Sequence, residues 1–194
     1  MKTLYLECNM GAAGDMLMAA LYELMSESEK QDFLETMNRL FPGVEIQPRQ
    51  AVTCGITGTH MDVTVRGEEE HSHDVALGCG HDHDHIHEHH HEHDHSHAHD
   101  HHHDHDHDHG HTHHHTAPAD IAALLDALDA PAEVKDAAKS IYARIADAEA
   151  KAHGMPVEKI HFHEVGALDA VADVTGACLA VHMLRPDHIT ASPV

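Results

Sequence analysis

The sequence predicts an α+β fold, a two-layer sandwich of helices on a small mixed sheet, interrupted by a disordered His-rich insertion. Three observations lead to this prediction. The expected elements run in the order strand, helices, two strands, helices and strand, and no internal repeat is apparent. The stretch His71–His115 holds most of the 29 histidines and contains no lysine or arginine. The residues outside it suffice for a single hydrophobic core.

The N-terminal segment predicts a buried strand over Thr3–Cys8, because it is short, apolar and followed by a glycine-bearing turn. Gly11 and Gly14 bracket that turn, and Asp15 begins an apolar helix that runs to about Met25. No stretch here is long and apolar enough for a membrane span, and the features of a secretory signal are missing.

A second helix is predicted from the capping-box spacing of Ser28 and Gln31. Pro42-Gly43 ends it, and its apolar face consists of Phe33, Leu34, Met37 and Leu40. Alternating polarity then predicts two strands, Val44–Val52 and Thr59–Arg66, as a hairpin or a neighbouring antiparallel pair whose link contains Gly55 and Gly58.

Three helices and a strand are predicted after the His-rich stretch. Pro118 opens a short helix, and Pro131 occupies the first position of a longer one that ends at Gly154. The expected core stripe of the longer helix is Val134, Ala138, Ile141, Ile145, Ala148 and Ala152. A strongly apolar helix follows from about Ala167 to Leu184, and 188–194 reads as a final strand.

This organisation divides the chain into a first part of the core (1–70), a disordered His/Asp-rich metal-binding linker (71–116) and a second part of the same core (117–194). The 34 acidic residues outnumber the 11 basic ones, for a formal net charge of −23. Such a surface attracts cations and disfavours nucleic acids and anionic membranes as partners. The four cysteines form no CxxC pair, which is typical of reduced thiols in a cytoplasmic protein.

The His-rich stretch predicts a high-capacity metal site. Histidine is largely neutral near pH 7, and neutral imidazole is the commonest side-chain ligand for divalent transition metals. We expect ligands throughout the stretch, with His81, His83, His85 and His87 as representatives. Imidazole and carboxylate favour copper, then nickel and zinc, without selecting one of them. A passive solvated linker is the alternative interpretation.

A second candidate metal site lies in residues 161–173. His161 and His163 would point to the same face of an extended segment. Asp169 and Asp173 are four residues apart and share one face of an apolar helix. Buried carboxylates need a cationic partner, so a metal ion at this stripe is expected. The alternative is a stripe that faces water or pairs with an arginine or lysine.

The glycine turn before the first helix is a candidate anion site. Free backbone N–H groups at a helix N-terminus bind anions, and Gly11, Gly14 and Asp15 would seat a phosphate or thiocarboxylate group there. A plain tight turn is an equally good interpretation. The remaining isolated histidines are interpreted as surface or hydrogen-bonded core residues: His60, His153, His182 and His188.

Three motifs together resemble the N-terminal half of the LarC family of nickel-insertion proteins. They are TLYLECNMGAAGDM at the start, CGITGTHMDV after the first helices and KIHFHEVGALDAVADVTG near the end. The resemblance covers 1–66 and 117–194, and a His-rich insertion between the second and third motifs is also typical of that family.

The resemblance implies a nickel chelatase, a cyclometallase of the lyase class. It would insert Ni²⁺ into pyridinium-3,5-bisthiocarboxylic acid mononucleotide to make the nickel-pincer cofactor of lactate racemase. It further implies CTP, Mn²⁺ or Mg²⁺, and a C-terminal half of the same family protein as partner, without which this part is expected to be inactive. A homo-oligomer is compatible with the sequence.

The proposed chemistry assigns His161, His163 and Glu164 as catalytic residues, one of them removing a ring proton from the precursor. His161, His163, Asp169 and Asp173 would be the metal ligands. The main alternative is a nickel or zinc storage or metallochaperone module without catalysis. A metal-dependent hydrolase using the same groups is a third interpretation.

Overall fold

The structure is a computed structural model that describes residues 1–9, 11, 13–67 and 116–193. The described residues before and after the gap build one hydrophobic core, so the two parts of the chain fold together. The α+β class predicted from the sequence is confirmed. None of the helices described is long and apolar enough to cross a membrane. His81, His83, His85 and His87 lie outside the described residues.

The described residues form two separate two-stranded sheets, one parallel and one antiparallel. The prediction of one small mixed sheet is corrected in this respect. In the first sheet, β1 (Thr3–Leu6) pairs in parallel with β4 (His188–Ala191), with Leu4 opposite Ile189. In the second, β2 (Val44–Thr53) pairs antiparallel with β3 (Ile56–Val65), as expected for a hairpin. Cys54 and Gly55 both have a positive φ, as the two central residues of a tight hairpin turn require.

The N-terminal helices are α1 (Gly14–Glu23) and α2 (Glu27–Leu40). The capping box of α2 is formed by Ser26 and Glu29, two residues earlier than the sequence predicted. Ser26 takes this role because its backbone is extended immediately before the helix, as an N-cap requires. The predicted apolar face of α2 is confirmed for Phe33, Met37 and Leu40, which are buried.

Three helices follow the gap: α3 (Pro118–Ala127), α4 (Ala132–His153) and α5 (Leu168–Leu184). Short 3₁₀ turns, η1 (Val157–Lys159) and η2 (Glu164–Gly166), lie between α4 and α5. The predicted stripe of α4 is confirmed for Val134 and Ala138, which are buried, and for Ile145, which is partly buried against the core. It is wrong for Ile141, Ala148 and Ala152, which are exposed. The helix buries Tyr142, Ala146 and Ala150 instead, and Ile141 is exposed.

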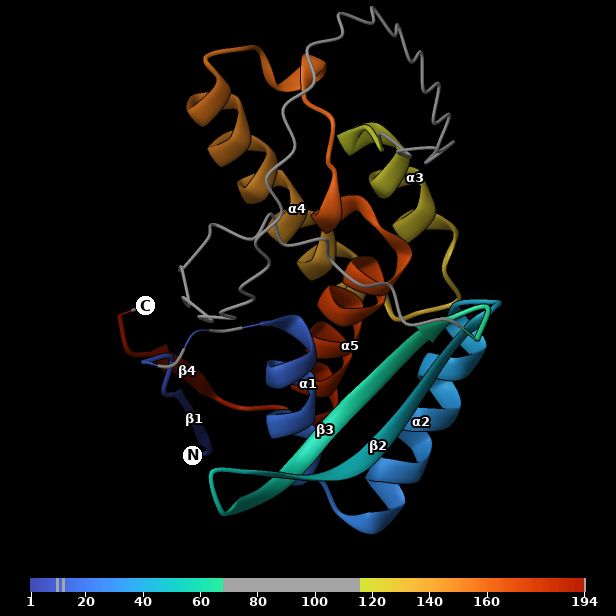
Figure 1. Cartoon of the computed structure of the whole chain (residues 1–194), viewed down its shortest axis with the longest axis vertical. Coiled ribbons are helices and arrows are strands. Elements are labelled where there is room, and N and C mark those ends of the chain that lie inside the picture. Colours follow the sequence, from blue (N-terminus) through green and yellow to red (C-terminus); the bar gives the residue numbers. More distant parts are fainter. Residues whose placement is uncertain (10, 12, 68–115, 194) are drawn as a thin grey trace, which may run out of the picture. The chain divides into compact units, whose positions relative to one another are not determined.

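Helix α5 is the centre of the fold. It contacts α1, α2, α4, the β2–β3 hairpin and η2, and in Figure 1 it runs beside α1. Its burial on several sides explains why its sequence is apolar all round. Gly176 of α5 lies directly against Met18 of α1 and Met37 of α2, a closeness that leaves no room for a side chain. This central position also brings Asp173 of α5 against Gly14 of α1, and both Asp169 and Asp173 within electrostatic reach of Tyr142 of α4.

Candidate functional site

Asp173 of α5 is packed against the N-terminus of α1. A Cβ built on Gly14 would lie 2.7 Å from the Cβ of Asp173, so only glycine permits this approach. The Asp173 carboxylate accepts a hydrogen bond from the backbone N–H of Asp15, one of the N–H groups that a helix leaves unpaired at its start. A side chain of the protein itself thus occupies part of the predicted anion site.

The surroundings of Asp173 disfavour its charged form. Burial, and then the neighbouring carboxylates of Asp15 and Asp169, raise the pKa of Asp173 to about 7. One of its oxygens, Oδ1, is fully buried and has no hydrogen-bond partner in the described part of the chain. An unpaired buried carboxylate oxygen is costly, and a proton or a cation would relieve that cost.

Asp169 lies in the first turn of α5, and its Oδ1 accepts the N–H of Ala170 at 2.6 Å. Tyr142 of α4 lies within electrostatic reach of both aspartates: burial, then Asp173, then Asp169 raise the pKa of its phenol. The Tyr142 hydroxyl donates to the carbonyl of Val165 at 3.0 Å. Tyr142 therefore links the aspartate stripe to the segment that carries His161 and His163.

That segment is fixed by pairing with the residue that follows the His-rich stretch. Phe162 donates its N–H to the Thr116 carbonyl at 2.9 Å, and Thr116 donates to the Phe162 carbonyl at 3.3 Å. The Phe162 side chain is only 1% exposed and stacks near Tyr142, with ring centroids 5.8 Å apart. His161 and His163, on either side of it, are both exposed, and Glu164 begins η2 and is exposed too.

His60 of β3, which we interpreted from the sequence as an isolated histidine, belongs to this neighbourhood. Its Nδ1 lies 4.0 Å from Oδ2 of Asp15, and its Nε2 lies 3.3 Å from Oδ1 of Asp62. Arg49 of β2 binds Asp62 from the opposite strand, with Nε–Oδ2 and Nη2–Oδ1 distances of 2.8 and 3.0 Å. The Arg49 guanidinium holds the pKa of Asp62 below its ordinary value.

The remaining predicted residue, Gly11, follows β1 in a turn with a φ of 93° and has open space where a side chain would be. The structure thus brings Asp15, Asp169 and Asp173 together and adds His60. Within the described part of the chain, no three His, Cys, Asp or Glu side chains are arranged to hold one metal ion. The ligand set of His161, His163, Asp169 and Asp173 therefore stays a prediction.

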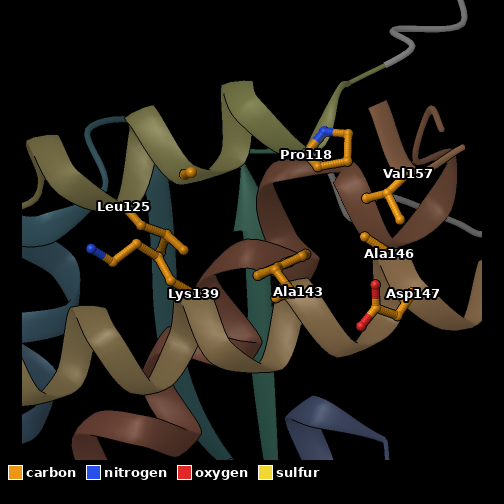
Figure 2. A pocket seen from close by; sticks show the side chains of 9 residues that line it. Pro118, Leu125, Lys139, Ala143, Ala146, Asp147 and Val157 are labelled. Carbon is orange, nitrogen blue, oxygen red and sulfur yellow. The ribbon is translucent and has the colours of Figure 1, made fainter. Parts of the chain in front are cut away.

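A small hollow lies between α3 and α4 (Figure 2), and Tyr142 is one of the residues that line it. Its volume is about 210 Å³, below the range of pockets that hold drug-sized ligands. Figure 2 shows Leu125 of α3 directed toward α4, with Ala143 and Ala146 of α4 opposite. The lining is mostly apolar, so we interpret the hollow as imperfect helix packing rather than as a nucleotide site.

An α+β core that carries imidazoles, carboxylates and a His-rich stretch is the framework of a protein that handles transition-metal ions. The model of the family described as nickel insertion protein matches residues 4–194, and the chain belongs to that family. No solved structure matches the chain.

Curated relatives carry a more specific name, pyridinium-3,5-bisthiocarboxylic acid mononucleotide nickel insertion protein. The one from Lactiplantibacillus plantarum is 38% identical over 194 residues, covering 100% of this chain and 40% of the relative. The one from Clostridium acetobutylicum is 39% identical and is covered over 44% of its length, and that from Geobacillus kaustophilus is 34% identical and covered over 39%; both matches span 100% of this chain. The chain thus spans about 40% of the length of these relatives.

Proposed function

We propose that this chain takes part in inserting nickel into pyridinium-3,5-bisthiocarboxylic acid mononucleotide, which yields the nickel-pincer cofactor of lactate racemase. The observation that carries the proposal is the family match over residues 4–194, joined to the printed name of the relatives. The reaction is a cyclometallation of the lyase class, placed in the cytoplasm. Nickel is a substrate in this scheme, delivered to the organic ligand and not retained by the protein.

The His-rich stretch, with His81, His83, His85 and His87, raises the local nickel concentration and passes the ion on by ligand exchange. The receiving groups are His161 and His163, with Asp169 and Asp173 as ligands or as acceptors that orient them. Two observations support this assignment. The pairing of Thr116 with Phe162 holds both histidines beside the point where the described chain resumes. The buried Oδ1 of Asp173 has no hydrogen-bond partner among the described residues, and a bound cation is one way to satisfy it.

Carbon–nickel bond formation breaks a ring C–H bond, so the leaving proton needs a base. Glu164, His161 or His163 takes this proton in our proposal, and the resulting bond joins the ring carbon to nickel. All three side chains are exposed and so accessible to a precursor in solution. Gly11 remains the proposed contact for the precursor's phosphate, because the space beside it is open.

CTP and Mn²⁺ or Mg²⁺ enter the proposal through the part of the relatives that this chain does not span. Asp15, Asp169 and Asp173 are oxygen donors of the kind that Mg²⁺ and Mn²⁺ prefer. They nevertheless form no ready group of three metal ligands among the described residues, so no step is assigned to that cation here. The proposed partners are the nickel-free precursor and the C-terminal half of the family protein.

The test is conversion of the precursor by a His161→Ala/His163→Ala double variant, supplemented with the remaining half of a family protein, CTP and nickel. We expect conversion to fall at least about tenfold, which corresponds to about 1.4 kcal/mol of transition-state stabilisation. The matched control is His153→Ala/His182→Ala, which removes two histidines outside the site. Full activity of the first variant would remove His161 and His163 from the mechanism.

A storage or metallochaperone module is the second candidate function. The composition of the His-rich stretch favours it, because many neutral imidazoles in one segment suit the binding of several metal ions at once. It predicts binding of several divalent metals with similar affinity. It also predicts that His161→Ala/His163→Ala leaves precursor conversion unchanged, which the same assay decides.

A further inference from the structure

The parallel pair of β1 and β4 is an incomplete sheet. In the described part of the chain, neither strand has another strand on its outer side. Parallel sheets in proteins are almost always covered on both faces, and a sheet of only two strands is marginal by itself. This pair is instead open: every residue of β4 is exposed, and Tyr5 of β1 and Ile189 of β4 are 57% and 50% exposed.

The other sheet shows how the protein treats an edge that has no neighbouring strand among the described residues. Asn38 of α2 accepts the Ile46 N–H of β2 at 2.8 Å and donates to the Ile46 carbonyl at 3.1 Å. Glu23 of α1 accepts the Thr59 N–H of β3 at 2.8 Å. Side chains thus satisfy backbone groups along both outer edges of the hairpin. Among the described residues, no side chain does this for β4.

Sheet edges exposed to solvent are usually protected by lysine, proline or a bulge. The β4 residues, His188–Ala191, contain neither lysine nor proline, and each pairs regularly with β1. Among the described residues, the N–H and C=O groups on the outer side of β4 have no partner, and the exposed Ile189 lies beside them. These are the features that an added strand uses, since its backbone completes the ladder and its alternate side chains cover the apolar residues.

The pair is also held firmly before any partner arrives. The Lys2 ammonium donates to the carbonyl of Leu184, the last residue of α5, at 2.6 Å. At the other end, Ser192 donates its N–H to the Leu6 carbonyl at 2.9 Å, and its Oγ accepts the Cys8 N–H at 2.8 Å. A preorganised edge loses little conformational entropy on binding.

We infer that the outer edge of β4 is an interaction surface for the part of the family's longer chains that this chain does not span, which adds an extended segment there. The lengths support this occupant. The relatives match across 100% of this chain while only about 40% of their own length is covered. The inference goes beyond the proposed nickel chemistry and does not depend on it.

Hydrogen exchange compares this chain with the intact relative from Lactiplantibacillus plantarum. We expect the amides of 188–191 that are not bonded to β1 to exchange at least about tenfold more slowly in the intact relative. The turn between β2 and β3, around Gly55, is the internal control and should exchange alike in both proteins. Equal exchange at 188–191 in the two proteins would overturn the inference.

A substitution tests the same surface by a second measurement. Substitution by aspartate at the position of Ile189 is made both in the intact relative and in this chain. It should lower the melting temperature of the relative by several degrees and leave that of this chain nearly unchanged. Aspartate at the position of Ile56, which is 75% exposed in the hairpin, is the control and should change neither. Slowed exchange in this chain that depends on its own concentration would instead identify a second copy as occupant, and the inference would be wrong.

Discussion

The Cβ of Asp173 lies 2.7 Å from the place where a Cβ on Gly14 would be. This contact joins α1 to α5, two helices that are far apart in the sequence. It puts the Asp173 carboxylate at the N-terminus of α1, where the Asp15 N–H donates a hydrogen bond to it. It also brings three acidic side chains into one neighbourhood, and only glycine at position 14 permits that arrangement.

Substitution of Gly14 by alanine should destabilise the protein by about 1–3 kcal/mol, because the added methyl group overlaps the Asp173 side chain and forces α1 and α5 apart. Urea denaturation followed by circular dichroism measures this effect. Gly58→Ala is the control, since its Cβ would meet only the end of the Glu23 side chain at 4.0 Å. Equal stability of Gly14→Ala and the native chain would show that the two helices do not meet as described.

The pH dependence of stability should report the raised pKa of Asp173. Its pKa is 3.8 in the unfolded chain and about 7 in the folded protein, so the folded state binds this proton more tightly. The stabilising contribution is complete below pH 4 and is lost as the pH rises toward 7. The free energy of unfolding of the native chain, measured relative to Asp173→Asn, should therefore fall across that interval. Asp129→Asn, at an exposed position, should show no such difference.

Removal of the Phe162 side chain should cost about 3–5 kcal/mol of stability, because this ring is completely buried against Tyr142. Under the proposed function the same change should weaken nickel binding at His161 and His163, since both flank Phe162 in the segment that pairs with Thr116. Phe33→Ala is the matched control, because it empties an equally buried ring position away from these histidines. Isothermal titration with nickel under native conditions measures the binding. Unchanged nickel binding by Phe162→Ala would contradict the prediction that the segment around Phe162 takes part in it.

Replacement of every histidine in 71–115 by serine should leave precursor conversion intact at saturating nickel and reduce it when nickel is scarce. The reason is that the proposed role of this stretch is to concentrate the ion, which excess nickel in solution makes unnecessary. A nickel titration of the conversion rate, in the presence of the remaining half of a family protein, measures the shift. Loss of conversion at every nickel concentration would assign chemistry to the stretch itself.

Local patterns predicted most of the helices and the hairpin. The α2 face of Phe33, Met37 and Leu40 and the left-handed end of α4 at Gly154 both follow from the sequence pattern. The stripe of α4 was wrong at Ile141 because the helix buries Tyr142, Ala146 and Ala150, and period counting selected the large apolar side chain at position 141. Packing partners decide such choices, and they are not visible in one helix.

The site was predicted in part for the same reason. Asp169 and Asp173 could be selected by their spacing in an apolar helix, but the approach of Asp15 depends on how α1 crosses α5. His60 was interpreted as isolated because one of its two partners, Asp15, belongs to α1 and is distant in the sequence. The sequence does contain a signal for His60. His60 and Asp62 are two residues apart and so share one face of β3, and Arg49 lies opposite them on β2.

The first and last strands of this protein pair with each other, and α1 packs on α5, so residues on the two sides of 68–115 complete a single core. The partners of β1 and α1 therefore come only after residue 116, from β4 and α5. A product that stopped before that point would leave one side of both elements without the neighbours they have here.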